Sequence, residues 1–289
     1  MQDMVVKTIE AVRNRVHEAR THGMTIALVP TMGALHAGHG SLIRAARSET
    51  GFVVVSIFVN PAQFGPHEDF HKYPRPLEQD LEFCRREGVD LVFHPEVGTV
   101  YPPEFRTYVT VEGWQDVLEG SSRPGHFRGV ATVVLKLFNM VQPDVAYFGQ
   151  KDAQQAVIIR QMVRDLDVPV RLRMCPIVRE PDGLALSSRN QYLDPIQRRQ
   201  ATVLSAALRH AEALAAAGER DAAVIQRAAA ECIAAAPGVV LDYLAVVSAD
   251  TLEPLERLQG NVLIAVAARL GATRLIDNVL LPDVPGSRA

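Results

Sequence analysis

The chain has little cysteine, little tryptophan and almost balanced charge. Its 289 residues include three cysteines and one tryptophan, and the formal net charge is −3. Cys84, Cys175 and Cys232 are far apart and match no metal-binding spacing, so we expect neither a disulfide framework nor a structural zinc. Such cysteines are typical of small buried side chains in a reducing compartment. The charge gives no reason to propose nucleic acid or an anionic membrane as a partner.

Long hydrophobic runs are also absent. No segment is long and apolar enough to span a bilayer, and residues 1–7 lack the apolar block of a signal peptide. We therefore expect a cytoplasmic protein with no membrane partner. Hydrophobic residues make up 48% of the chain and charged residues 22%, which favours a packed core over disorder. The length allows one large domain or two ordinary ones.

Residues 30–40 (PTMGALHAGHG) lack three common functional motifs. The spacing from Gly33 to Gly38 matches the start of a P-loop, but His39 stands where that motif needs lysine. The dinucleotide fingerprint GxGxxG is absent. The zinc motif HExxH is absent too, because His36 and His39 are three residues apart and not four.

What this stretch does contain is an HxGH pattern between a predicted strand and a predicted helix. The apolar run 25–29 precedes it, and residues 41–47 have helical spacing. A helix start offers unpaired N–H groups and a partial positive charge, which suit a phosphate. The pattern resembles the nucleotide-binding signature of the adenylyl- and cytidylyltransferase superfamily, in which both imidazoles touch the triphosphate. The alternative is a tight turn with incidental histidines.

The first two thirds of the chain alternate between predicted strands and predicted helices. The strands are expected at 25–29, 51–59, 90–93, 144–148 and 168–174, and the helices at 41–47, 76–87, 129–141 and 152–166. Repeated strand–helix units require a parallel sheet, and ligands gather at the carboxyl ends of its strands. The HxGH turn, the Asn60 turn and the turn 149–152 all follow strand ends, so we expect one site at that edge.

The composition changes after about Met174. The turn-rich segment 178–183 is followed by two alanine-rich helices and then three strands, expected at 194–216, 221–235, 239–247, 261–268 and 273–278. The predicted fold class is α/β. A Rossmann-like parallel sheet flanked by helices occupies residues 1–176, and a smaller α+β C-terminal domain occupies residues 177–289.

Five further segments carry polar residues in distinctive surroundings: 58–64 (FVNPAQF), 73–75 (YPR), 126–130 (HFRGV), 147–155 (YFGQKDAQQ) and 186–190 (LSSRN). Together with PTMG and HxGH, they resemble the pantothenate synthetase (pantoate–β-alanine ligase) family over essentially the whole chain. The resemblance implies that pantoate attacks ATP to form an acyl-adenylate and pyrophosphate. The amine of β-alanine then attacks the pantoyl carbonyl and AMP leaves. It also implies Mg²⁺ with the ATP, a homodimer, a first domain that binds nucleotide and pantoate, and a C-terminal lid.

The resemblance also assigns roles to residues. The implied catalytic groups are His36, His39, Lys151, Ser187, Ser188 and Arg189. Lys151 lies between a predicted strand and a predicted helix, where its charge and the helix dipole can act on phosphate together. The alternative for Lys151 is an ordinary solvated lysine. The alternative for the Ser-Ser-Arg segment is a helix-capping serine.

Binding roles are implied for a further set. The expected ATP-binding residues are Met32, Gly38, Gly149, Asp152, Val178 and Leu186, and those for pantoate are Gln63 and Gln155. Neutral amides can orient the hydroxyls and carboxylate of pantoate without quenching the nucleophile. Asn60 and Arg128 are candidates for β-alanine or pyrophosphate. Asp152 could instead only stabilise a helix start. Packing on the pantoate methyl groups and ordinary core packing are both open for Met32, Phe58 and Phe64.

Asp80 is the candidate metal residue. Its surroundings are Glu78-Gln79-Asp80, so only Asp80 is acidic where some relatives carry two acids in a row. We therefore expect contact with Mg²⁺ through water. The alternative is a solvated helix face. The nearby residues His67, Glu68, Asp69 and His71 lie in a Pro- and Gly-rich loop, for which a flap over the site is favoured over metal binding.

Two other functions stay open at this point. One is a nucleotidyltransferase that joins AMP or CMP to a phosphorylated acceptor, for which arginines would be expected in place of Gln63 and Gln155. The other is a non-catalytic nucleotide-sensing module. Both histidines, Lys151 and Arg189 argue against that second alternative.

Overall fold

The computed structural model describes residues 4–66, 68 and 70–285, which form two compact units. The first unit contains residues up to 149 together with 158–176. The second contains residues 150–157 together with those from 177 onward. The expected domain boundary between residues 176 and 177 stays a prediction, and residues 150–157 pack with the second unit.

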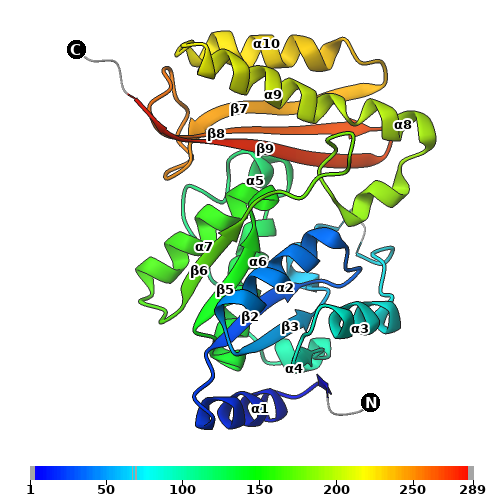
Figure 1. The fold of residues 1–289 in the computed structure, drawn as a ribbon, viewed down its shortest axis with the longest axis vertical. Helices are drawn as coiled ribbons and strands as arrows, with labels where there is room; N and C mark the ends of the chain where they lie inside the picture. Colours follow the sequence, from blue (N-terminus) through cyan, green and yellow to red (C-terminus); the bar gives the residue numbers. More distant parts are fainter. Residues whose placement is uncertain (1–3, 67, 69, 286–289) are drawn as a thin grey trace. The chain divides into compact units, whose positions relative to one another are not determined.

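A six-stranded parallel sheet forms the centre of the first unit (Figure 1). Its order is β1-β4-β3-β2-β5-β6, and the strands are Val5–Val6, Ile26–Thr31, Phe52–Ile57, Leu91–Phe93, Val145–Gly149 and Arg171–Cys175 in chain order. The predicted parallel sheet is confirmed. Since β2, β3 and β5 are neighbours, the HxGH turn, the Asn60 turn and Gly149 all lie at the carboxyl ends of adjacent strands.

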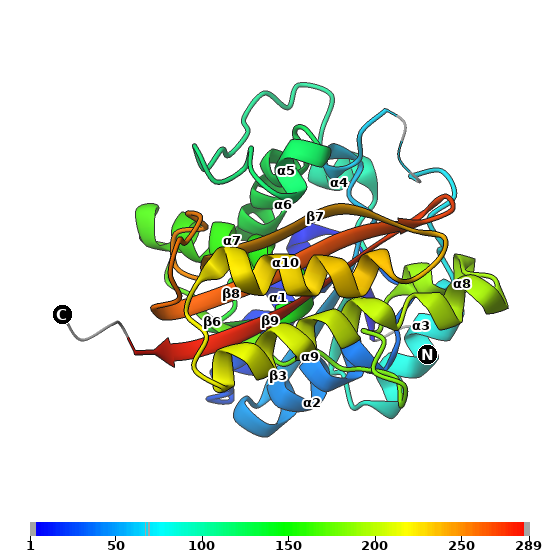
Figure 2. The same cartoon turned by 90° about the horizontal axis from the view of Figure 1, so that it is seen from above.

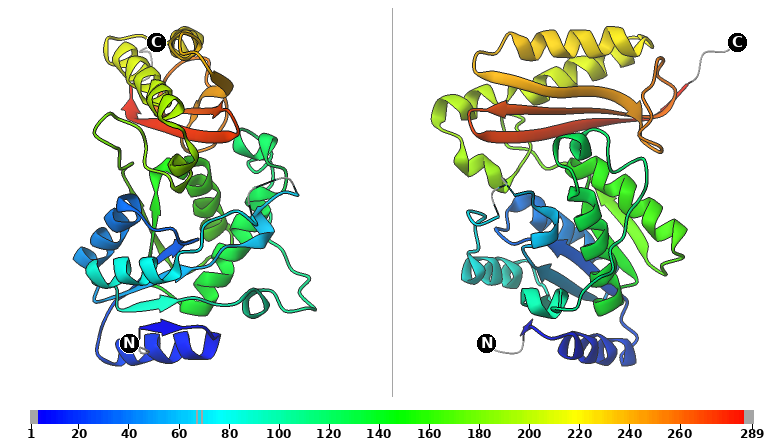
Figure 3. Two further views of the ribbon diagram at one scale, coloured as in Figure 1. Left: turned by 90° about the vertical axis from the view of Figure 1, so that its right-hand side faces the viewer. Right: turned by 180° about the vertical axis from the view of Figure 1, so that it is seen from behind.

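Helices cover both faces of this sheet (Figure 3). One face packs against α1 (Ile9–Thr21), α6 (His126–Val141) and part of α7 (Ala153–Asp165), and the other against α2 (Ala37–Glu49) and α3 (Leu77–Arg86). Alternate strand residues enter the two cores, so the central strands are apolar on both sides, as in other covered parallel sheets. Two short helices, α4 (Val97–Val100) and α5 (Glu119–Ser122), lie in the connections.

Helix α6 starts three residues earlier than expected, at His126, after Gly125 in a left-handed conformation. From the sequence, the apolar surface of this helix from Gly129 onward is one candidate contact for the homodimer that the resemblance implies. Its apolar residues, including Val130, Val134 and Leu137, are buried in the core of the first unit. They are therefore not available to a second subunit.

The second unit is an antiparallel sheet with two long helices on one face (Figure 2). The sheet order is β7-β8-β9, with strands Val239–Ser248, Gly260–Leu270 and Thr273–Val284. Helices α9 (Val203–Ala216) and α10 (Ala222–Ala234) bury leucines and isoleucines against alternate residues of β8. The smaller α+β domain predicted for this part of the chain is confirmed.

One helix expected from 194 to 216 is two helices. The first, α8, spans Pro195–Gln200, and α9 begins at Val203. Between them, the backbone N–H and the hydroxyl of Thr202 both bond to the carbonyl of Arg199, three residues back. Such local side-chain bonds compete with the regular helix ladder, which explains the interruption.

A membrane-crossing helix is not found in the part of the chain that the structure describes, because none is both long and apolar enough.

Candidate active site

The two histidines of HxGH both lie at the start of α2, directly after β2. His36 is the residue that caps the helix, and its Nδ1 accepts the backbone N–H of Gly38 at 3.1 Å. His39 is in the first turn, and its Nδ1 accepts the backbone N–H of His36 at 3.3 Å. The two ring centroids are 4.2 Å apart. The strand–turn–helix context predicted for the motif is confirmed.

These bonds assign the tautomers of the imidazoles. Because each Nδ1 accepts an N–H, a neutral ring carries its proton on Nε2. Each Nε2–H is then a donor at a helix start, where the backbone dipole already favours negative charge. Two side chains from one short turn thus present the donors that a phosphate group needs.

Asp80 on α3 anchors the loop that leads to these histidines. Its carboxylate accepts the backbone N–H of Ala34 at 2.9 Å and that of Leu35 at 2.7 Å. Gly33, in the same loop, has φ +83, and an added Cβ would lie 2.9 Å from Oδ2 of Asp80. Burial raises the pKa of Asp80, while the two N–H bonds oppose that shift. At 3% exposure the side chain is buried, so the interpretation as a solvated helix face is wrong.

The Asn60 turn brings three predicted site residues together. Asn60 caps a short 3₁₀ helix, η1 (Pro61–Gln63), and is 1% exposed. Its amide donates to Oε1 of Gln63 at 3.0 Å and to the carbonyl of Gly129 at 3.1 Å, and its Oδ1 accepts from the Tyr101 hydroxyl at 2.8 Å. The amide of Gln63 in turn lies 3.2 Å from the sulfur of Met32. The orientation of Gln63 is therefore set by Asn60 and Met32.

Glycine is required at position 129 by this packing. A Cβ there would lie 2.1 Å from the carbonyl oxygen of Ala62 and 2.6 Å from the backbone nitrogen of Gln63. Real Cβ atoms do not approach backbone so closely. The first turn of α6 can contact η1 only because residue 129 has no side chain.

A buried histidine next to this turn was not predicted as a functional residue. His126 is 8% exposed, and its Nδ1 lies 2.8 Å from the carbonyl oxygen of Gln63. Its Nε2 lies 3.0 Å from Nη1 of Arg123. The Nε and Nη2 of the same guanidinium donate to Glu68 at 2.7 Å each. Arginine can only donate, so Nε2 accepts and Nδ1–H donates to Gln63. Burial, followed by the charge of Arg123, lowers the pKa of His126 to about 4.

Other predicted residues of the first unit lie in ordinary contacts. Arg128 is exposed and stacks over the ring of Tyr108 at 3.7 Å, so a role with β-alanine or pyrophosphate stays a prediction. Phe58 belongs to the hydrophobic core, and Phe64 packs edge-on against Phe70. In the loop considered as a flap, Glu68 pairs with Arg123. His67 and Asp69 lie outside the described residues.

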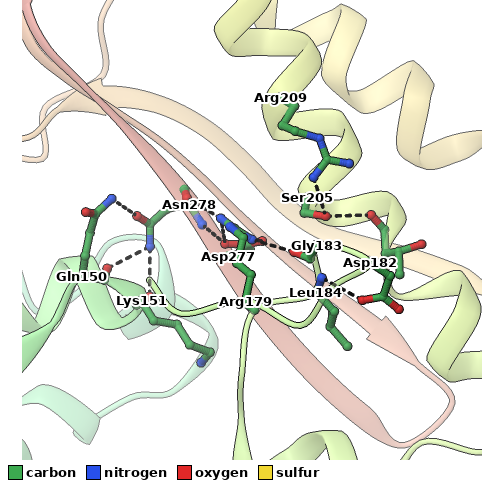
Figure 4. A network of polar contacts seen from close by, with 12 residues as sticks. Gln150, Lys151, Arg179, Asp182, Gly183, Leu184, Ser205, Arg209, Asp277 and Asn278 are labelled. Carbon is green, nitrogen blue, oxygen red and sulfur yellow. Dashed lines mark hydrogen bonds and ion pairs between the residues drawn. The ribbon is translucent and has the colours of Figure 1, made fainter. Parts of the chain in front are cut away.

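Lys151 lies in a 3₁₀ turn, η2 (Gln150–Asp152), between β5 and α7 (Figure 4). The predicted position after a strand and before a helix is confirmed. Asp152 is exposed, and Gln155, in the first turn of α7, is half-buried. A Cβ built on Gly149 would meet no described atom within 4 Å. The backbone at residue 149 is therefore open to a close approach.

Val178 and Leu186, both expected to line the adenine, pair across a hairpin. The backbone N–H of Leu186 donates to the carbonyl of Val178 at 3.0 Å, and Arg179 pairs with Ala185 inside this pair. Directly after it, Ser187 caps η3 (Ser188–Tyr192) and accepts the N–H of Arg189 at 3.2 Å. The capping role considered for Ser187 is thus present, and Ser188 and Arg189 are half-buried in η3.

Comparisons with known proteins agree over nearly the whole chain. The model of the pantoate–β-alanine ligase family matches residues 4–280. The chain belongs to the pantoate–β-alanine ligase family. A relative named pantothenate synthetase, from Moorella thermoacetica, is 59% identical over 277 residues, which cover 96% of this chain and 98% of the relative.

Solved structures of this ligase family have the same fold. The crystal structure of pantothenate synthetase from Thermus thermophilus has a TM-score of 0.92 and 47% identity, and the match covers 98% of this chain and 100% of that one. A pantoate–β-alanine ligase from Francisella tularensis, described as complexed with β-γ ATP and β-alanine, has a TM-score of 0.77 and 34% identity. That match covers 96% of this chain and 97% of the other.

Proposed function

We propose that this chain joins pantoate to β-alanine with ATP through a pantoyl-adenylate. A pantoate carboxylate oxygen attacks the α-phosphorus and pyrophosphate leaves. The β-alanine nitrogen then attacks the pantoyl carbonyl, the acyl C–O bond breaks, AMP leaves and the amine loses a proton. The observation that carries this proposal is the imidazole pair capping α2, in a chain that matches the ligase family over residues 4–280.

The first step concentrates negative charge on the phosphates, so it needs donors and cations held in place beforehand. We assign His36 and His39 to phosphate oxygens through their Nε2–H groups. Their Nδ1 bonds to the backbone hold the rings, which limits reorganisation during the reaction. Lys151 supplies a point charge, and the segment Ser187, Ser188 and Arg189 supplies hydroxyl donors and a guanidinium.

Gln63 and Gln155 are the residues assigned to pantoate. The amide Oε1 of Gln63 is engaged by Asn60 and its NH₂ contacts Met32, so its orientation is set before substrate arrives. Neutral amides can bind the hydroxyls and carboxylate of pantoate and leave the carboxylate nucleophilic. Asn60 acts here by orienting Gln63. Arg128 remains the candidate for the carboxylate of β-alanine or for pyrophosphate.

The nucleotide is assigned to groups from several segments. Gly38 and Gly149 allow close approach, Asp152 accepts from the ribose hydroxyls, and Val178 and Leu186 line the adenine. The Val178–Leu186 pairing brings these two residues opposite each other in one hairpin, which supports assigning them to the same ring. Met32 is assigned to ATP, and its sulfur also contacts the amide of Gln63, which is assigned to pantoate.

The proposed metal is Mg²⁺ bound mainly through the phosphates of ATP. Among the described residues, no group of three or more His, Cys, Asp or Glu side chains could hold a metal ion. Both oxygens of Asp80 already accept backbone N–H bonds, which favours contact through water over direct ligation. When bound, Mg²⁺ would neutralise phosphate charge. We expect Asp80→Asn to weaken ATP binding but to leave the Mg²⁺ concentration for half-maximal rate within about twofold, and a large shift would indicate direct ligation.

We also infer a homodimer that works in the cytoplasm. The family resemblance supports the first inference, and the free thiols of Cys84, Cys175 and Cys232 are compatible with the second. Sedimentation velocity should give twice the 31.7 kDa mass of one chain, and a monomer at micromolar concentration would contradict the dimer.

The product profile tests the proposed function. Purified protein with pantoate, ATP and β-alanine should form pantothenate and AMP in equal amounts. When β-alanine is omitted, about one enzyme equivalent of pyrophosphate should appear as the bound adenylate accumulates. Formation of ADP would contradict adenylate chemistry. Lys151→Ala serves as the matched inactive control and should lose on the order of a hundredfold in rate, the scale of one lost transition-state donor.

A further inference from the structure

Two adjacent buried polar side chains on β9 connect the segments assigned to the nucleotide. Asp277 and Asn278 are each 3% exposed, in a strand whose other buried residues are mostly apolar. Buried polar groups are costly unless they are hydrogen-bonded, so the partners of these two residues show what they hold in place.

Asn278 holds the turn that carries Lys151 (Figure 4). Its Nδ2 donates to the carbonyl oxygens of Gln150 and Lys151, both at 3.0 Å. Its Oδ1 accepts from the side-chain amide of Gln150 at 3.3 Å. Both N–H groups and the oxygen of one buried amide are thus used on two consecutive residues of η2.

Asp277 holds the hairpin that carries Val178 and Leu186. Its carboxylate accepts two bonds from the guanidinium of Arg179, at 2.6 and 2.9 Å. Arg179 also donates to the carbonyl of Gly183 at 3.0 Å, across the same hairpin. The side chain of Asp277 is 2% exposed and that of Arg179 is 29% exposed, so the pair is largely shielded from water.

We propose that Asp277 and Asn278 are positioning residues that hold the Lys151 turn and the adenine hairpin at a fixed spacing. This inference rests on the proposed function, because it takes the assigned roles of Lys151, Val178 and Leu186. A lysine side chain is flexible, and its reach is set by where its backbone lies. A displacement of about 1 Å at a reacting group can cost on the order of a hundredfold in rate. Because Asp277 and Asn278 are adjacent on β9, they couple the position of the adenine hairpin to the position of the Lys151 ammonium.

The first test separates hydrogen bonding from space filling at residue 278. Asn278→Ala removes the donors, and Asn278→Asp keeps the size but places a carboxylate against two carbonyl oxygens. We expect pyrophosphate release in a single turnover to slow by about tenfold to a hundredfold in the first variant, and by more in the second. The KM for β-alanine should stay within about threefold. Asn261→Ala is the matched control, because Asn261 lies on β8 and bonds to Asp250 and Asp283 instead.

The second test asks whether Asn278 acts through Lys151. In a Lys151→Ala background, Asn278→Ala should have almost no further effect on the rate, because the group that it positions is gone. Additive losses would indicate a general structural role and overturn the proposal. A parental rate in Asn278→Ala and Asn278→Asp, together with a large loss in Lys151→Ala, would also overturn it while leaving the proposed function intact. Absence of AMP formation by the parent protein would refute the proposed function itself.

A third variant keeps the proposal testable if substitutions at residue 278 prevent folding. Arg179→Lys retains the charge but cannot make the two-bond contact with Asp277. We expect the KM for ATP to rise by about tenfold and the KM for pantoate to stay within about threefold, in a variant that still folds like the parent. An unchanged KM for ATP would show that the Arg179–Asp277 pair does not position the hairpin, and would refute that half of the proposal.

Discussion

Acid should lower the free energy of unfolding of the first unit through His126, and the size of this loss follows from the lowered pKa of the buried imidazole. The pKa of His126 is lowered from its ordinary value of 6.5 to about 4, first by burial and then by the charge of Arg123. The two values differ by about 2.5, and a difference of one is worth about 1.4 kcal/mol, so full protonation would cost about 3 kcal/mol. The unfolded chain binds the proton more readily than the folded one. The stability that depends on neutral His126 is therefore complete above pH 6.5 and is lost as the pH falls toward 4.

At pH 5, about 2 kcal/mol of this contribution should be gone relative to pH 7.5, since the unfolded histidine is then mostly protonated and the folded one is not. The assay is urea unfolding at both pH values, followed by fluorescence of Trp114. This is the one tryptophan of the chain, and it packs against the core of the first unit.

The matched variant is His126→Asn. Its amide can keep a donor toward the carbonyl of Gln63, but it does not titrate. Carboxylates such as Glu68 and Glu119, which act on His126, remain in both proteins, so the difference between the two pH responses isolates the histidine. The reasoning is refuted if both proteins lose the same free energy of unfolding between pH 7.5 and pH 5. It is also refuted if the imidazole titrates near 6.5 in the folded protein.

Three further predictions concern packing and binding. Gly129→Ala should lose about 3 kcal/mol in free energy of unfolding because its Cβ would meet the Ala62 carbonyl, whereas Gly98→Ala, with no atom within 4 Å, should not; equal urea midpoints would contradict this. His39→Ala should lower kcat about a hundredfold in the AMP-forming assay, and near-parental activity would mean that the phosphates bind elsewhere. Gln155→Ala should raise the KM for pantoate about tenfold and that for ATP less than threefold, and equal effects on both would refute its assignment.

Much of the fold could be predicted from local signals. The apolar runs of the central strands and the strand–turn–helix around HxGH were found because each is continuous in the chain. Helix α1 was missed although its signals are present. Thr8 accepts the N–H of Ala11 at the helix start, and Val12, Val16 and Ala19 are buried at helical spacing. Strand β1 has only two residues, which is too short for any periodicity to appear.

The supporting contacts of the candidate site could not be predicted in the same way. Asp80 lies 45 residues from Leu35, and Arg179 lies 98 residues from Asp277. Nothing local in the chain distinguishes such a carboxylate from a solvated one, because its partner is fixed by the fold. His126 is similar, since its tautomer follows from Arg123 on one side and a backbone carbonyl on the other. Sequence patterns predicted which residues carry the chemistry, and the three-dimensional structure was needed to identify what holds them.

Oxygen transfer from pantoate to AMP tests the central claim most directly. Pantoate labelled with ¹⁸O in both carboxylate oxygens is turned over with ATP and β-alanine, and the nucleotide product is analysed by mass spectrometry. If a pantoyl-adenylate forms, each AMP carries one labelled oxygen on its phosphate, because the acyl C–O bond breaks in the second step. Unlabelled AMP, or label found in inorganic phosphate beside ADP, would contradict the account.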